Sequence, residues 1–167
     1  MFPYIHFDGT CAEAMPFYAG VFGASDLQMM RYNQAPSTEG PGGASDRVMH
    51  SQMTAMGSTL MASDYPPGMG APQSGMSIML APATVAEAKR LYDALADGGA
   101  IIHAFGPTFF SPGFGMVKDR FGTHWIVGAA AACPALDKGH LRNRPQVARD
   151  LAPPLAATLR HPKVAGR

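Results

Sequence analysis

The feature that most constrains the fold is an internal repeat with a register of 74 residues. The segment Thr10-Cys11-Ala12-Glu13-Ala14, followed by Tyr18, matches Thr84-Val85-Ala86-Glu87-Ala88, followed by Tyr92. Each copy places a glutamate three residues after a threonine, which is the pattern of a capping box at the start of a helix. Two copies of one helix start predict that a single supersecondary unit occurs twice in the chain.

The segments around the two helix starts predict the same order of elements in each copy. The first helix runs through Phe22 and ends at Gly23, and the second runs through Leu95 and ends at Gly98-Gly99. Extended segments are expected at 3–7, 27–32, 47–55 and 58–63 around the first helix, and at 77–81, 101–105, 114–118 and 123–127 around the second. The last two of each set form a hairpin at a glycine. We therefore predict an α+β fold in which duplicated βαβββ modules form a curled mixed sheet around a cavity.

Charge and proline content predict where the domain ends. Residues 133–167 hold seven basic and two acidic side chains, a net charge of +5, whereas the whole 167-residue chain carries only +1. Five prolines interrupt this segment. We expect one domain at 1–132, with module 1 at about 1–64 and module 2 at about 75–130, followed by a basic C-terminal arm at 133–167.

Composition excludes several classes of protein. Two cysteines do not make a disulfide scaffold, and no apolar run approaches the ~18 residues of a membrane span. We therefore expect a cytoplasmic protein that does not bind a membrane. The near-neutral charge argues against a nucleic-acid partner, although the basic arm leaves open an interaction module whose binding would depend on salt.

Several segments together resemble the PhnB-like branch of the vicinal oxygen chelate superfamily, which includes glyoxalase I, extradiol dioxygenases and bleomycin-resistance proteins. The resemblance covers about residues 1–130 and rests on Tyr4–Gly9, Val21–Ala24, Gln28–Tyr32, Thr59–Asp64 and Phe114–Gly122, with Trp125. It implies a ligand cavity shared by the two modules, and a homodimer. The methyltransferase label often given to this branch is not inherited, because Gly40 and Gly42-Gly43 open no helix after a strand.

The resemblance also indicates where a metal would be held. Metal enzymes of the superfamily use positions that correspond here to Pro3, Met61, Ser77 and Ile126, none of which offers an imidazole or a carboxylate. We therefore predict no metal site and no cofactor. The alternative is a metal-dependent lyase, isomerase or dioxygenase that uses the strand histidines His50 and His124, with His6 or His103.

Our leading hypothesis is a metal-free protein that binds a small apolar or aromatic metabolite in the sheet cavity. If the chain is an enzyme at all, the superfamily implies a lyase or isomerase. Histidine and glutamine on strands can anchor a ligand, and methionine and phenylalanine can line an adaptable apolar pocket. The candidate ligand-binding residues are His50, Gln52, His124, Met61, Met79, Phe7 and Phe110.

Overall fold

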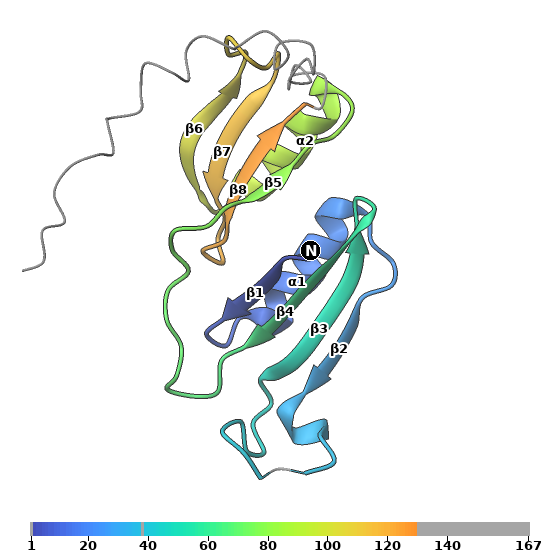
Figure 1. Ribbon diagram of the computed structural model, residues 1–167, viewed down its shortest axis with the longest axis vertical. Helices are drawn as coiled ribbons and strands as arrows, with labels where there is room; N and C mark the ends of the chain where they lie inside the picture. Colours follow the sequence, from blue (N-terminus) through green and yellow to red (C-terminus); the bar gives the residue numbers. More distant parts are fainter. Residues whose placement is uncertain (1, 38, 130–167) are drawn as a thin grey trace, which may run out of the picture. The chain divides into compact units, whose positions relative to one another are not determined.

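A computed structural model describes residues 2–37 and 39–129 of the chain (Figure 1). Its elements are β1 (Tyr4–Phe7), α1 (Cys11–Phe22), β2 (Gln28–Arg31), a short 3-10 helix η1 (Tyr32–Gln34), β3 (Val48–Ala55), β4 (Ser58–Asp64), β5 (Ile78–Leu80), α2 (Val85–Ala96), β6 (Ala100–Gly106), β7 (Phe114–Lys118) and β8 (His124–Gly128). The order is βαβββ twice, so the predicted α+β fold with duplicated modules is confirmed. The boundary at 132 and the arm at 133–167 lie outside the described residues.

The strands form two four-stranded mixed sheets with the same topology. The first has the order β1-β4-β3-β2 and the second the order β5-β8-β7-β6. In each sheet the outer strand that precedes the helix pairs in parallel, and the other neighbours pair antiparallel. Within the described ranges β1 and β5 are both edge strands and are not paired with each other. The expected curled sheet therefore consists of two separate sheets.

Each helix covers one face of its own sheet and leaves the other face open (Figure 1). On the first sheet Ile5 and Phe7 are buried, and Phe7 lies 6.4 Å from the ring of Tyr18 on α1. On the second sheet Leu80 and Val127 belong to the buried core, as does Leu91 of α2. Side chains at alternate strand positions point to the open faces.

The two helices begin differently, although the sequence predicted a threonine cap for both. Thr84 accepts a hydrogen bond from the backbone N–H of Glu87 at 3.1 Å, as expected. Thr10 makes no such bond, so its predicted cap is wrong. The carboxylate of Asp64, at the end of β4, instead accepts from the backbone N–H groups of Gly9 (2.9 Å) and Cys11 (3.0 Å). The start of α1 is therefore capped by a side chain that is distant in sequence, which a local sequence pattern cannot show.

The strand register of the repeat is 73 residues rather than 74. The helices α1 and α2 begin 74 residues apart, whereas the last residues of β1 and β5, Phe7 and Leu80, are 73 apart and both buried. The cause is one extra residue in the loop between β5 and α2. The predicted equivalence of Pro3 and Ser77 is therefore wrong: Pro3 alternates with Ile5 on the helix side, and Ser77 alternates with exposed Met79 on the open side.

A buried hydrogen-bond cluster joins the two modules. The hydroxyl of Tyr18 on α1 donates to Oδ2 of Asp119 at 2.6 Å and lies 3.1 Å from Oγ1 of Thr123. The same Oδ2 accepts from the indole N–H of Trp125 at 2.7 Å. The rings of Tyr18 and Trp125 meet edge-on with centroids 5.3 Å apart. Module 1 thus reaches the β7–β8 turn of module 2 through one helix residue.

No helix among the described residues is long and apolar enough to cross a membrane. The connection between β4 and β5, residues 65–77, contains no regular element. Tyr65 begins it with a hydrogen bond from its backbone N–H to the carbonyl of Phe7 at 2.8 Å. This connection, called the linker below, passes beside the cavity that the two modules share.

Candidate functional site

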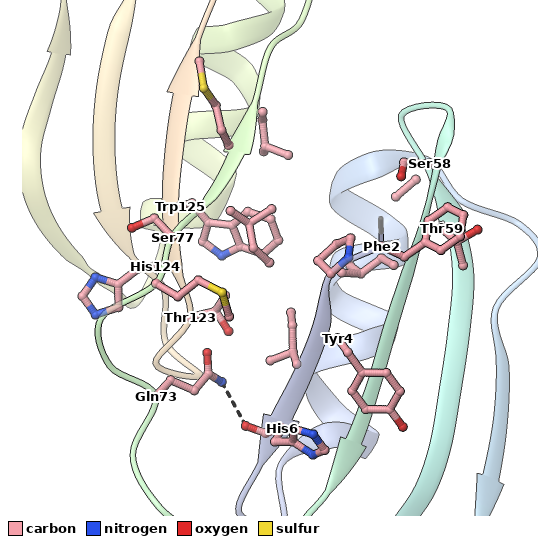
Figure 2. A pocket seen from close by; sticks show the side chains of 18 of the residues that line it. Phe2, Tyr4, His6, Ser58, Thr59, Gln73, Ser77, Thr123, His124 and Trp125 are labelled. Atoms are coloured by element: carbon pink, nitrogen blue, oxygen red, sulfur yellow. Dashed lines mark hydrogen bonds between the residues drawn. The ribbon is translucent and has the colours of Figure 1, made fainter.

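A cavity of about 880 Å³ lies between the edge strands β1 and β5 (Figure 2). The β3–β4 hairpin, the linker and the start of β8 complete its walls. Cavities of this size hold drug-sized ligands in other proteins. The two modules and their connection therefore supply a space in which a small molecule fits.

The cavity contacts both edge strands at consecutive residues. On one side it is lined by residues 2–6 and on the other by 76–81. A space under the face of a sheet contacts alternate residues, because side chains of a strand point alternately to opposite faces. Contact with consecutive residues shows that the strands present their edges to the cavity.

The lining is mainly apolar and aromatic and includes no Asp, Glu, Lys or Arg among the described residues. Its aromatic members are Phe2, Tyr4, Phe22, Tyr65 and Trp125, and its polar members are His6, Ser58, Thr59, Gln73, Ser74, Ser77, Thr123 and His124. Burying an ionised group without a partner costs several kcal/mol or more. The cavity therefore favours an uncharged ligand with an apolar body.

His6 is held from three sides at the edge of the cavity. Its Nδ1 lies 3.0 Å from Oγ of Ser63 on the neighbouring strand, and its ring stacks on Tyr65 with centroids 4.9 Å apart. Its backbone carbonyl accepts a hydrogen bond from Nε2 of Gln73 in the linker at 3.3 Å, as Figure 2 shows. Tyr4 lies next to it, with ring centroids 4.9 Å apart.

A polar strip crosses the open face of the first sheet. The hydroxyl of Tyr4 lies 3.1 Å from Nδ1 of His50, and Nε2 of His50 lies 3.5 Å from Oε1 of Gln52. Gln52 donates in turn to Oε1 of Gln28 at 3.3 Å. Met61 is paired between Tyr4 and Gln52 in the sheet register. The structure thus brings together three predicted residues, His50, Gln52 and Met61, beside the cavity rather than in its lining.

The open face of the second sheet is apolar at its centre, with His103 beside Phe114 and a Lys118–His124 pair at the start of β8. Met79 pairs with Ile126, and Ile126 pairs with Met116 on the next strand. Phe114 lies on the same face two residues before Met116. The two modules therefore present different chemistry on equivalent surfaces.

The other predicted ligand-binding residues lie in three different places. His124 and Met79 line the cavity. Phe7 is buried against α1 and is only 2% exposed, so it packs in the core and faces neither the cavity nor the open face. Phe110 lies in the loop between β6 and β7, where its ring meets Phe114 edge-on with centroids 5.1 Å apart.

Sequence reasoning did not select Tyr4, Tyr65 or Gln73 for the site. Tyr4 and His6 are two residues apart in one strand, so their side chains point to the same face of the sheet. This spacing is the one feature of the sequence that could have indicated Tyr4. The position of Tyr65 and Gln73 depends on the path of the linker, and nothing in the sequence marks that path.

The positions that would hold a metal do not fit one. Met61, Ser77 and Ile126 lie on the open faces of their sheets. Pro3 instead faces the helix, and the residues of β1 that face the open side are Tyr4 and His6. No group of three His, Cys, Asp or Glu side chains that could hold a metal ion occurs among residues 2–37 and 39–129. His50 and His124, which the metal-dependent alternative requires, belong to different sheets.

Cys11 is fully buried at the start of α1. Burial, followed in importance by the nearby charge of Asp64, raises the pKa of its thiol to about 12. A thiol that stays protonated at neutral pH is a poor nucleophile. Cys11 is therefore part of the core and not a reactive group.

Comparison with known proteins gives matches over nearly all of the described chain. The family model described as 3-demethylubiquinone-9 3-methyltransferase matches residues 1–128. Protein YjdN of Escherichia coli (strain K12) is 33% identical over 141 residues, which cover 79% of this chain and 96% of that protein.

Solved structures give the same result. Protein PA1353 from Pseudomonas aeruginosa matches with a TM-score of 0.71 and 37% identity, covering 77% of this chain and 96% of that one. A Bacillus cereus protein described as a putative 3-demethylubiquinone-9 3-methyltransferase, PhnB protein, matches with a TM-score of 0.66 and 28% identity, covering 78% and 98%. A glyoxalase/bleomycin resistance protein/dioxygenase family enzyme from Burkholderia phytofirmans PsJN shares the fold, with a TM-score of 0.50 and 16% identity over 77% of this chain and 96% of that one.

Proposed function

Since the chain belongs to the PhnB-like, 3-demethylubiquinone-9 3-methyltransferase family of the vicinal oxygen chelate superfamily, we propose that it binds a small apolar or aromatic metabolite without a metal ion. The binding site in this proposal is the cavity between β1 and β5. One observation supports it most strongly: a space of about 880 Å³ has a lining rich in aromatic and aliphatic side chains and without formally charged ones. Binding an apolar molecule in such a space is favourable, because apolar surface of the ligand and of the lining is removed from water.

The single tryptophan of the chain makes this proposal directly testable. Trp125 lines the cavity, so a ligand bound there changes the emission of Trp125 or accepts excitation energy from it. We use N-phenyl-1-naphthylamine, an uncharged aromatic probe whose emission rises in apolar surroundings. The expected result is saturable binding with energy transfer from Trp125.

Two matched substitutions locate the bound probe. Ser77→Phe adds a ring inside the cavity and is expected to abolish binding, because the volume that the probe needs is filled. Thr54→Phe adds the same ring at an exposed position of β3 outside the lining and is expected to leave binding unchanged. Equal binding by both variants would show that the probe sits elsewhere and would contradict the proposal.

We also propose that the protein is a homodimer. Supporting this, β6 forms the outer edge of the second sheet, and its exposed Ile101 and Ile102 stand in a strand without Pro, Lys, Arg, Asp or Glu. Monomers usually protect such an edge with charge or proline.

A further inference from the structure

The two strands that flank the cavity each have one backbone edge that is unpaired within residues 2–37 and 39–129. In this part of the chain β1 pairs only with β4, and β5 pairs only with β8. The cavity contacts both strands at consecutive residues, so their free edges face it. A strand edge is a row of N–H and C=O groups that can pair with a suitable ligand.

The hydrogen bonds of β1 show which of its groups face the cavity. The carbonyl of Pro3 accepts from the N–H of Met61, and the carbonyl of Phe7 accepts from the N–H of Tyr65. Alternate residues of a strand turn their backbone groups to the same side. Pro3, Ile5 and Phe7 therefore pair towards β4, and the N–H and C=O groups of Tyr4 and His6 point outward.

A carboxamide already occupies part of this outward edge. The side-chain Nε2 of Gln73 donates to the carbonyl of His6 at 3.3 Å (Figure 2). Gln73 belongs to the linker, in which Gly68 (φ 77°) and Gly75 (φ 72°) adopt backbone angles that glycine tolerates best. Among the described residues, the other hydrogen bonds between the linker and the modules are both made by the backbone of Tyr65, at the start of the linker. Gln73 can therefore leave His6 without breaking them.

We propose that the ligand class is an uncharged amide: an apolar or aromatic body carrying an N–H beside a C=O, which pairs with the backbone edge of His6 in place of Gln73. This inference rests on the proposed function, because it names the chemistry of the molecule bound in that same cavity. The amide N–H donates to the carbonyl of His6, and its C=O accepts from the outward N–H of His6. A carboxylate of the same shape lacks the donor and enters a lining without a formally charged side chain.

The first experiment compares 4-phenylbutanamide with 4-phenylbutanoate, which have the same shape and differ in charge and hydrogen-bond donors. Each displaces N-phenyl-1-naphthylamine from the full-length protein at pH 7, with Trp125 as the donor fluorophore. We expect the amide to bind at least about tenfold more tightly, the factor that corresponds to roughly 1.4 kcal/mol. Equal or tighter binding of the carboxylate would overturn the inference.

The second experiment removes the outward backbone donor. His6→Pro deletes the N–H that faces the cavity and leaves the bonds of Ile5 and Phe7 to β4, since proline is tolerated at an edge strand when its missing N–H points away from the sheet. His6→Ala is the matched control, because both variants lose the imidazole. We expect 4-phenylbutanamide to bind about three- to tenfold more weakly to His6→Pro than to His6→Ala. An unchanged ratio would contradict pairing with the strand edge.

A third variant keeps the inference testable if His6→Pro does not fold. Gln73→Ala removes the competing carboxamide and is expected to tighten binding of 4-phenylbutanamide severalfold, whereas Met69→Ala, in the same linker but outside the lining, leaves it unchanged. Weaker binding by Gln73→Ala would show that Gln73 holds the ligand, which contradicts its role as a stand-in.

These outcomes separate the inference from the proposed function. Failure of N-phenyl-1-naphthylamine to bind the wild-type protein would refute the cavity as a ligand site. Binding of that probe without preference for the amide would refute only the ligand class.

Discussion

Asp64 shows how one buried side chain organises its surroundings. Besides the N–H groups of Gly9 and Cys11, its carboxylate accepts from the N–H of Val48 at 2.9 Å. It thereby joins the end of β4 to the start of α1 and to β3. Aspartate is usually exposed, so no local pattern places Asp64 in the core. Its role could be found only from the tertiary structure.

The buried thiol of Cys11 predicts a loss of stability in alkaline solution. Its pKa of about 12 in the folded protein compares with an ordinary value of 9.0. The unfolded chain therefore loses this proton first, so the stabilisation is complete below pH 9 and is lost as pH rises from 9 to 12. We expect the free energy of unfolding, measured with urea, to fall by up to about 1.4 kcal/mol per pH unit in that window.

Cys11→Ala is the control for this effect. The variant is less stable at every pH because it loses buried volume, but its stability should decline less steeply above pH 9. The pKa of Tyr18 is raised too, mainly by burial and then by the charge of Asp119, and it contributes a slope in the same direction in both proteins. Identical slopes for wild type and variant would show that Cys11 is not the group responsible.

At the scale of elements, the hairpin between β3 and β4 holds a strained residue. Met56 has φ 50° and Gly57 has φ 78°, and both are the central residues of a two-residue turn between the paired Ala55 and Ser58. Such turns favour asparagine followed by glycine, and methionine tolerates positive φ poorly. We expect Met56→Asn to raise the free energy of unfolding by about 0.5–1 kcal/mol, measured by thermal or urea denaturation.

The control for this substitution is the same change at a methionine whose backbone φ is not positive. Met69 is exposed in the linker, and Met69→Asn should leave stability nearly unchanged. A destabilised Met56→Asn protein would mean that the contacts of the Met56 side chain outweigh the strain of its backbone.

Elements were predictable here because their signals are local. The repeated helix start, the glycines after each helix and the hairpin glycines placed every strand within a few residues of its observed bounds. A cavity shared by the two modules was predicted, but its position between two strand edges was not, because the distance between these edges depends on how the modules pack. Alternation along a strand places His50 and Gln52 on one face of β3, but it does not show that this face lies beside the cavity.

At the scale of the whole molecule, the exposed apolar residues of β6 and of the loop that follows it predict self-association. We expect a mass twice that of the 17.6 kDa chain in sedimentation equilibrium. Ile101→Lys places a charge on the edge strand and should shift the mass to that of a monomer.

The matched substitution is Met30→Lys on β2, the corresponding edge of the first sheet, which should leave the dimer intact. Both variants should still bind N-phenyl-1-naphthylamine, since neither residue lines the cavity. A monomeric wild-type protein would refute the homodimer.

The unlike open faces of the two modules have a consequence for how a guest molecule is oriented. A duplicated scaffold with identical halves would accept an elongated guest equally well in either direction. Here the first sheet presents Tyr4, His50 and Gln52 beside the cavity, whereas the second presents Met79 and Ile126. For the proposed binding site, we expect these unlike surroundings to favour one orientation of a guest that has a single polar end.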